Sequence, residues 1–372
     1  MVTHHYLHGN GGGVYASRAY INAFAEIADY ITLLYPMKEG LDIEGISNKV
    51  NAIPIYNKKG RVRKALGLLT GKIHRYFDCF ENYLKQADYD YVVFDSSYVS
   101  FRLIDIAHQY GCKVITIHHN YQVEYVKGNS TRFWRGIYLY WVKRLEKESI
   151  LKSDLNLTLT KQDCYLLAKH YADGNQEKIE VLGCFESTER SVVKALHKKN
   201  RYRFIITGSL GDVQTEMSLI PWLESYYPIL KDVIPDADLV IAGRNPSERL
   251  IELCKNKGVL LIPSPKKMQP LLDAADFYIC PTSLGGGLKL RVMDGLKCGL
   301  PIICHEVSAR GYDIFVDKGY VFVYNDVSSF RECLNVLIKS SFNHQDVQDL
   351  YESVFAFNAG IKRLKNNLQK II

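Results

Sequence analysis

Short hydrophobic runs alternate with longer amphipathic stretches along most of the chain. The runs are rich in β-branched and aromatic residues and are mostly continuous, which is typical of strands buried on both faces of a parallel sheet. The stretches between them have the length and period of helices, and one predicted helix covers residues 217–230. This alternation predicts an α/β fold with parallel sheets. The predicted strands cover residues 2–7, 31–35, 52–56, 91–95, 113–118, 155–160, 179–183, 203–209, 237–243, 259–264, 277–281, 301–306 and 320–324.

The alternating pattern restarts once along the chain. Residues 186–200 are polar and lysine-rich and carry no strand pattern, and a new strand–turn–helix unit begins at Arg203. The predicted strands are also too many for one open sheet. We therefore predict two Rossmann-like domains, residues 1–185 and 201–345, which face a central cleft and are joined by the linker 186–200. Residues 346–372 are predicted to form a helix that packs back across the hinge on the first domain.

Length and composition agree with a two-domain globular protein. The chain has 372 residues, of which 47% are hydrophobic and 23% charged, so a coiled coil or a disordered chain is excluded. The net charge of +7 is a mild bias that suits an anionic partner such as a nucleotide, a lipid headgroup or an anionic polymer. The sequence lacks the dense basic stripe that is typical of DNA-binding proteins, so we expect no nucleic acid as a partner.

Cysteine usage and the absence of targeting segments indicate a cytoplasmic protein. The nine cysteines are scattered, and no two of them form a C-x-x-C pair. We interpret them as reduced thiols, and their spacing predicts no zinc site. No secretory signal precedes the first strand, and no apolar run reaches the ~20 residues of a membrane span.

A glycine-rich turn follows the first predicted strand. Ligands of open parallel sheets bind at the carboxyl ends of the strands, so residues that follow strands are the informative ones. Gly11, Gly12 and Gly13 precede a helical stretch over 14–28 and would let a ligand approach the backbone, and a helix N-terminus favours an anion. The spacing is not G-x-G-x-x-G, and a tight turn without a ligand is the alternative interpretation.

The strongest pattern lies between residues 281 and 301. Gly285, Gly286 and Gly287 follow a predicted strand, and a helix is predicted to begin near Leu288 and to end at a C-terminal glycine. The first turn of that helix carries two cations. A cation at a helix N-terminus interacts unfavourably with the helix dipole and destabilises the helix by ~0.3–1 kcal/mol. A diphosphate bound at the glycine amides would neutralise the charge of these cations. The alternative interpretation is that both cations are solvated on the surface. These cations are Lys289 and Arg291.

Other candidates follow neighbouring strands. Gly208 and Ser209 are small residues between a predicted strand and a predicted helix, in the same order of elements as at the two glycine segments. His118 ends the strand 113–118 and is a candidate polar group in the cleft; Asp95, at the end of another strand, is a weaker candidate. The two Asp-x-Asp pairs at 88–90 and 236–238 precede their strands, at the opposite edge, so we exclude them as a divalent-metal site.

A basic stretch in the first half is a candidate membrane contact. Its five cations stand beside the apolar residues 65–69, a pattern that suits an anionic membrane surface. A solvated basic helix start is an equally good interpretation. The five cations are Lys58, Lys59, Arg61, Arg63 and Lys64.

With these motifs the chain resembles the retaining GT-B glycosyltransferases of family 4, also called glycosyl transferases group 1. In the second half, Gly208-Ser209-Leu210, the strand 239–243, the segment 274–276 and the block 285–301 occur in the family's order. The first half resembles the family more loosely, through the glycine turn, His118 and Arg144-Leu145-Glu146. The resemblance spans residues 1–345.

The resemblance implies transfer of a hexosyl or N-acetylhexosaminyl group from a nucleotide-sugar to a carbohydrate or lipid-linked saccharide acceptor. It further implies retention of configuration, no metal, no cofactor, and a role in bacterial surface-polysaccharide biosynthesis at the inner face of the cytoplasmic membrane. Asp294 would hold the ribose hydroxyls of the donor, and His118 would contact the transferred sugar. The implied donor-binding residues are Gly208, Ser209, Gly286, Gly287, Leu288, Lys289, Arg291 and Asp294.

Three departures from the family pattern keep alternatives open. Asp294 is one methylene shorter than the usual glutamate, glycines replace an upstream glutamate, and Ser209 and Gln214 replace an Arg/Lys pair. A non-catalytic GT-B partner or sugar-nucleotide-binding module is therefore the first alternative. A non-hydrolysing sugar-nucleotide epimerase is the second, and it would need acid/base carboxylates, for which Asp95 is the main candidate.

Overall fold

The computed structural model describes residues 1–9, 11–38, 41, 43–56, 74–129, 132–186 and 201–371. The chain divides into two compact units. Unit 1 comprises Met1–Val126, Thr131–Thr188 and Phe355–Ile372, and unit 2 comprises Lys127–Ser130 and Glu189–Val354. The basic stretch 58–64 lies outside the described residues, so its contact with a membrane stays a prediction. Along the described ranges, no helix combines the length and apolarity needed to cross a membrane.

Unit 1 is built on a seven-stranded parallel sheet in the order β3-β2-β1-β4-β5-β6-β7. The short first strand lies between the second and the fourth, since Val2 is paired with both Leu34 and Phe94. The strand order therefore reverses between β1 and β4. The strands are β1 (Val2–Thr3), β2 (Ile31–Met37), β3 (Val50–Tyr56), β4 (Tyr91–Asp95), β5 (Lys113–His118), β6 (Leu155–Thr158) and β7 (Ile179–Val181).

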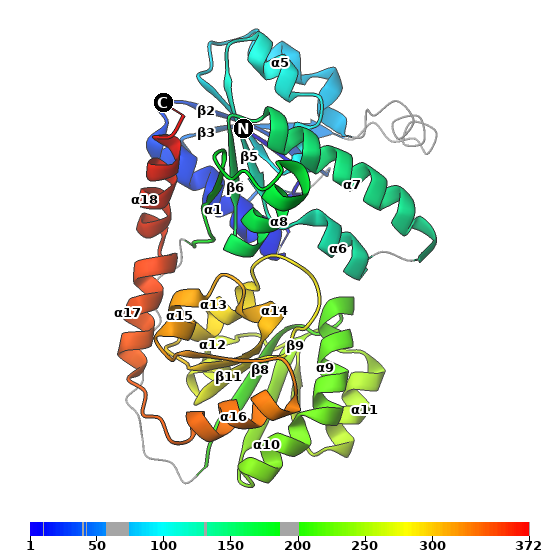
Figure 1. The fold of residues 1–372 in the computed structure, drawn as a ribbon, viewed down its shortest axis with the longest axis vertical. Helices are drawn as coiled ribbons and strands as arrows, with labels where there is room; N and C mark the ends of the chain where they lie inside the picture. Colours follow the sequence, from blue (N-terminus) through cyan, green and yellow to red (C-terminus); the bar gives the residue numbers. More distant parts are fainter. Residues whose placement is uncertain are drawn as a thin grey trace. The chain divides into compact units, whose positions relative to one another are not determined.

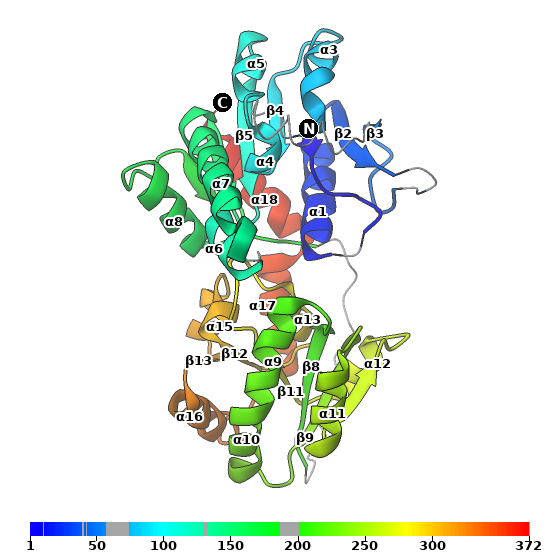
Figure 2. The same ribbon diagram turned by 90° about the vertical axis from the view of Figure 1, so that its right-hand side faces the viewer.

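Helices pack on this sheet, and the C-terminal helix of the chain is one of them. Helix α18 lies against α1 in both ribbon views (Figures 1 and 2). Its Gly360 lies so close to Phe185 that a Cβ there would be 2.1 Å from the ring atom Cγ. The helices of unit 1 are α1 (Gly12–Ile27), α3 (Phe80–Leu84), α4 (Ser97–Ser100), α5 (Ile104–Gln109), α6 (Gln122–Asn129), α7 (Arg132–Lys152), α8 (Lys161–Tyr171) and α18 (Phe357–Leu368), with a 3-10 turn at Arg75–Asp78.

Unit 2 repeats this design with a six-stranded parallel sheet in the order β10-β9-β8-β11-β12-β13. Its strand order reverses between β8 and β11. The strands are β8 (Arg203–Ser209), β9 (Asp238–Arg244), β10 (Leu260–Pro263), β11 (Phe277–Cys280), β12 (Ile302–His305) and β13 (Val321–Tyr324). The helices are α9 (Val213–Ser225), α10 (Tyr227–Val233), α11 (Glu248–Asn256), α12 (Gln269–Asp273), α13 (Leu290–Lys297), α14 (Glu306–Ala309), α15 (Asp313–Asp317), α16 (Val327–Leu337) and α17 (His344–Phe355).

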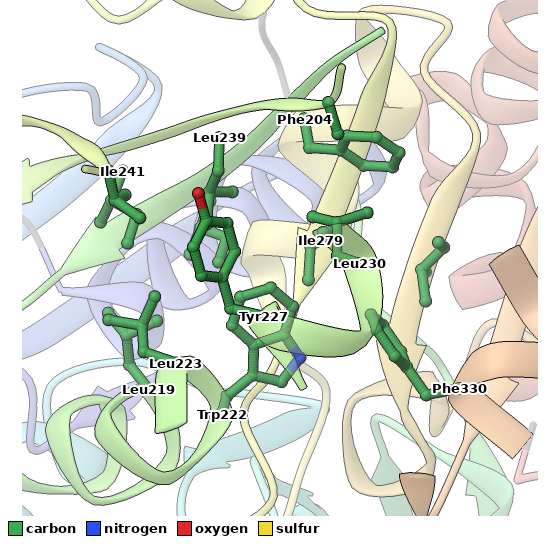
Figure 3. Packing of buried hydrophobic residues seen from close by; sticks show 14 of the residues in the cluster. Phe204, Leu219, Trp222, Leu223, Tyr227, Leu230, Leu239, Ile241, Ile279 and Phe330 are labelled. Atoms are coloured by element: carbon green, nitrogen blue, oxygen red, sulfur yellow. The ribbon is translucent and has the colours of Figure 1, made fainter. Parts of the chain in front are cut away.

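One face of the unit 2 sheet carries an aromatic core. Trp222 from α9 and Phe330 from α16 meet edge to face with ring centroids 5.8 Å apart, and Phe204 of β8 is fully buried in the same cluster (Figure 3). Burial of a side chain of this size stabilises a fold by ~1.5–3 kcal/mol. This core fixes β8, and therefore the residues that follow it.

The fold confirms two α/β domains with parallel sheets, and it corrects two helices. The predicted helix 217–230 is broken at Tyr226 into α9 and α10, because Pro228 has no amide hydrogen to bond the carbonyl four residues back. The predicted helix 346–372 is likewise two helices, α17 and α18. Ala356 between them is extended, and the amide of Glu186 donates to the carbonyl of Phe355 at 3.0 Å.

Candidate functional site

Each sheet has one position where its strand order reverses, and ligands of open parallel sheets bind at the carboxyl ends of the strands at such a position. In unit 2 these strands are β8 and β11, and in unit 1 they are β1 and β4. Each unit therefore has its own candidate site, and the two are described separately.

In unit 2, Arg291 is anchored at the end of β8. Gly208 has a φ of 152°, and a Cβ at this position would lie 2.8 Å from the Cζ atom of Arg291. The guanidinium group donates to Thr215 Oγ1 at 2.7 Å and to Thr282 Oγ1 at 3.4 Å. Arg291 is thus held in a fixed, half-buried position, which disfavours the interpretation that it is a solvated surface cation.

The glycine segment and Lys289 lie beside it. Gly285 and Gly287 have φ values of 84° and 71°, a left-handed region that glycine adopts without strain. Lys289 is the N-cap residue of α13, and its ammonium group donates to the carbonyl of Gly286 at 3.1 Å. The amide nitrogen of Gln214 is buried at the same place and has no hydrogen-bond partner among the described residues. The site therefore presents donors and positive charge, which suit an anion.

Asp294 stands on the exposed side of α13. The helix itself lies directly on the sheet, because a Cβ at Gly295 would be 2.6 Å from Ile302 Cδ1 and 2.9 Å from the ring of Tyr278. The structure thus brings Gly208, the glycine segment, Lys289 and Arg291 together at the carboxyl edge of one sheet. The donor-binding roles of these residues and of Asp294 stay predictions.

In unit 1, a buried carboxylate lies among imidazole rings. Asp95, at the end of β4, is fully buried; its Oδ2 accepts from Thr3 Oγ1 at 2.6 Å, and its Oδ1 accepts from His119 Nε2 at 2.6 Å. Burial alone would raise the pKa of Asp95, but the charge and hydrogen bond of His119 hold the pKa at about 2. Asp95 is therefore ionised at neutral pH. The ring of His5, which follows β1, lies 5.2 Å from the ring of His119.

His118, the predicted sugar-contacting residue, is buried in the sheet with 2% of its surface exposed. Its Nε2 donates to Asn156 Oδ1 at 2.9 Å, and burial lowers its pKa to about 4. Its Nδ1 is buried without a partner among the residues described. His118 is thus a neutral imidazole with one free acceptor nitrogen, and its contact with a sugar stays a prediction.

The glycine turn of unit 1 makes room for His5. Helix α1 begins at Gly12, two residues before the predicted start, and Gly11 is its N-cap. A Cβ at Gly13 would lie 2.6 Å from Cε1 and 3.0 Å from Nε2 of His5, whereas a Cβ at Gly11 would meet nothing within 4 Å. Gly13 therefore has a packing role, and an anion-binding role of Gly11, Gly12 and Gly13 stays a prediction.

A small cavity lies next to the group of Asp95 and its imidazole neighbours, and His4 and Ser96 are among its lining residues. Its volume is about 160 Å³, and its lining residues are His4, Ser96, Ser97, Tyr98, Gln122, Val142 and Leu145. The carboxyl group of Glu146 holds one wall of the cavity in place, since it accepts from the amide of Gln122 at 2.6 Å and from the hydroxyl of Tyr171 at 2.9 Å. Burial raises the pKa of Glu146 to about 8.

His5 and its contact with Asp95 and His119 are the main feature that the sequence did not predict. One ligand atom from each of these three residues lies within 4.8 Å of the others. The rule about carboxyl ends of strands would have identified His5 had the first strand been predicted to end at Thr3. The prediction that the chain has no metal site rested on cysteine spacing and on the Asp-x-Asp pairs, and it did not consider this group.

Comparisons with known proteins agree with the fold, and the matched family covers most of unit 2. The family Glycosyl transferases group 1 matches residues 201–340. An uncharacterized 44.6 kDa protein in the cps region of Klebsiella pneumoniae is 21% identical over 287 residues, which are 72% of this chain and 70% of that protein.

Several solved structures have the same fold at low sequence identity. The apo form of the lipopolysaccharide outer core galactosyltransferase WaaB has a TM-score of 0.70 at 11% identity and covers 100% of this chain and 99% of its own. Sucrose-phosphate synthase from Thermosynechococcus elongatus has a TM-score of 0.74 at 13% identity, with 100% and 98% covered. Anabaena HepE in complex with UDP and glucose has a TM-score of 0.64 at 12% identity, with 99% and 98% covered. Likeness at this identity shows a common architecture, which is GT-B.

Proposed function

We propose that the chain, whose residues 201–340 match the family Glycosyl transferases group 1, transfers a sugar from a nucleotide-sugar to a saccharide acceptor. The donor supplies a hexosyl or N-acetylhexosaminyl group, and the acceptor is a carbohydrate or a lipid-linked saccharide. The reaction retains the configuration of the sugar and serves the synthesis of a bacterial surface polysaccharide.

The observation that carries the proposal is the anion site at the carboxyl ends of β8 and β11. Lys289 and Arg291 bring two positive charges to the start of α13, beside a glycine backbone that can approach a ligand closely. A departing nucleoside diphosphate gains negative charge as the bond to the sugar breaks, and fixed cations stabilise that charge in the transition state. With these cations in place, the diphosphate needs no divalent metal.

Two further residues would orient the donor. Asp294 would accept hydrogen bonds from the ribose hydroxyls, because its carboxylate is exposed on the first turns of α13. The buried amide nitrogen of Gln214 would donate to a donor oxygen and thereby gain its missing partner. Gln214 would thus take over part of the role of the cation pair that the family usually has nearby.

Retention would follow a front-face route, in which the leaving phosphate helps to deprotonate the acceptor hydroxyl. His118 would assist by hydrogen bonding to the transferred sugar. Its pKa of about 4 keeps the ring neutral, so it would position the sugar rather than add charge.

The acceptor class is supported by the nature of the relatives. One relative stands in a cps region, one neighbouring structure is a lipopolysaccharide outer core galactosyltransferase, and another contains UDP and glucose. We propose a uridine-diphosphate sugar as the first donor to test. A peripheral position at the inner membrane face would use the basic stretch 58–64, and liposome co-sedimentation that survives neutralisation of its five cations would contradict that part.

Calorimetric titration with UDP tests the donor site. Lys289→Ala should weaken binding by ~1–3 kcal/mol, the contribution of a hydrogen bond to a charged group. Lys267→Ala, a change of an exposed lysine in the same unit, serves as the matched control and should bind like the wild type. Equal affinity of Lys289→Ala and the wild type would remove Lys289 from the site. Binding without hydrolysis or transfer of any common nucleotide-sugar would instead favour a non-catalytic binding module.

A further inference from the structure

The group His5, Asp95 and His119 in unit 1 is a candidate metal centre. We propose that these three side chains bind one divalent transition-metal ion, and that the ion is zinc. This inference goes beyond the proposed function, in which the charge of the diphosphate is compensated in unit 2 without a metal.

The geometry of the three ligand atoms suits a tetrahedral ion. They lie within 4.8 Å of one another. Bonds of ~2.0–2.1 Å in a tetrahedral zinc site place the ligand atoms roughly 3.3 Å apart. Asp95 Oδ1 and His119 Nε2, now 2.6 Å apart, would separate by ~0.7 Å as the ion replaces the proton between them. The ligand atom of His5 lies within 4.8 Å of the other two and would complete the protein's share of the coordination.

A ring nitrogen without a partner points to a missing ligand. His5 Nε2 is buried and forms no hydrogen bond to any residue of the described chain. Buried polar atoms are nearly always paired, so an unpaired one needs an explanation. A metal ion would give this lone pair a partner. Gly13 leaves the space in which the ring lies, since any side chain there would collide with Cε1 and Nε2.

The surroundings hold the carboxylate in a suitable orientation. Thr3 Oγ1 donates to Asp95 Oδ2 and leaves Oδ1 directed at His119, as outer hydrogen bonds do for metal-binding carboxylates. Two imidazoles and one carboxylate are a common zinc set, in which water or another oxygen ligand completes the coordination. The same set also binds iron(II), and the experiment below separates the two ions.

Another His–Asp pair of unit 1 provides a matched control. His108 Nε2 lies 3.0 Å from Asp154 Oδ2, but both side chains are more than one-third exposed, and the described residues show no second imidazole within the same group. Among the described residues, this pair thus lacks the third ligand of the proposed site. His108→Ala removes this pair without touching the candidate centre.

The test measures metal content and affinity of the full chain. The purified protein is stripped with a chelator, dialysed against zinc or iron(II) salts, and analysed by inductively coupled plasma mass spectrometry and by zinc titration calorimetry. We expect about one zinc per chain, a preference for zinc over iron(II), and a rise in melting temperature on zinc addition. His5→Ala and His119→Ala should each weaken zinc binding at least ~tenfold, and His108→Ala should bind like the wild type.

Asp95→Asn alone is a poor test because Asp95 is buried and its loss could unfold unit 1. The cobalt(II) absorption spectrum of the wild type therefore serves as a second measurement, since four-coordinate N/O ligation has a characteristic visible band. A stripped chain that takes up no zinc, or unchanged affinity in both His5→Ala and His119→Ala, would overturn the proposal. These readouts do not depend on sugar transfer, so they can fail while the proposed function stands, and the reverse.

Discussion

Replacing Glu146 by glutamine should make the chain more stable at alkaline pH. Glu146 is fully buried on α7, and it accepts one hydrogen bond from a backbone amide and one from the hydroxyl of Tyr171. Burial raises its pKa to about 8, and these hydrogen bonds offset that effect only in part. The folded protein therefore carries this carboxyl in its protonated form at neutral pH.

The pH dependence follows from the difference between the folded and unfolded states. In the unfolded chain the carboxyl group titrates near ~4.3. Between this value and about 8 the folded state retains a proton that the unfolded state has released, so stability falls as the pH rises. Each pH unit in this window costs ~1.36 kcal/mol, which sums to roughly 3.6 kcal/mol at pH 7.

Glu146→Gln has the same shape and no titration. Its amide oxygen can accept from the amide of Gln122, and its amide nitrogen can donate to the hydroxyl oxygen of Tyr171. We expect the variant and the wild type to have similar stability near pH ~4.5, and the variant to gain steadily as the pH rises. At ~2–4 °C per kcal/mol, the melting temperature of the variant should exceed that of the wild type by roughly 7–14 °C at pH 7.

The assay is thermal unfolding followed by circular dichroism at pH values across this window, with urea unfolding as a second measure. Glu177→Gln is the control, because Glu177 is an exposed glutamate of the same unit. Its melting temperatures should follow those of the wild type at every pH. A difference between Glu146→Gln and the wild type that stays constant with pH would refute the reasoning, since it would mean that Glu146 is ionised in the folded state.

Three other changes test separate parts of the structure. Gly360→Ala should destabilise unit 1 by ~1–3 kcal/mol, because its methyl group would collide with the buried ring of Phe185. Gly136→Ala is the control: it lies in an open helical position and should be neutral or stabilising by ~0.5–1 kcal/mol. Thermal unfolding measures both effects. Burial lowers the pKa of His74 to about 4, so stability should be lost as the pH falls from ~6.5 towards 4, and urea unfolding of His74→Gln should show a weaker loss. Arg291→Lys keeps the charge but loses the two threonine contacts, so calorimetry should show weaker UDP binding; unchanged affinity would exclude a positioning role for the guanidinium.

The strands were predictable because a strand that is buried on both faces needs a continuous run of apolar residues, which is visible in the sequence. Continuous apolar runs such as 203–209 and 277–281 leave few alternatives to a buried parallel strand, and the structure has strands at both. Helix boundaries were less predictable, because the apolar period of 217–230 continues through Tyr226 while the backbone hydrogen bonds do not. Pro228 stands at the start of α10, where its missing amide hydrogen leaves the carbonyl four residues back without that bond.

In the candidate sites, too, short motifs could be predicted from the sequence, whereas contacts between residues far apart in the chain could not. Glycines and cations near β8 and α13 were recognisable from their place after strands. That Arg291 is anchored by Thr215, 76 positions away, depends on how the helices pack and has no local signature. His5 was hidden for a related reason: the first apolar run appeared to include it, but the strand ends at Thr3, and this places His5 at the carboxyl edge of the sheet.

The two units apply one topology to opposite chemistry. Both sheets reverse their order between the first and the fourth strand, so both open the same edge to a ligand. In unit 2 that edge holds glycine amides, Lys289 and Arg291, which supply hydrogen-bond donors and positive charge. In unit 1 it holds the ionised Asp95 with His5 and His119, which attract a cation and repel a phosphate. The side chains at the switch point, rather than the fold, thus decide what each unit can bind, and the proposed donor site and the proposed metal centre do not exclude each other.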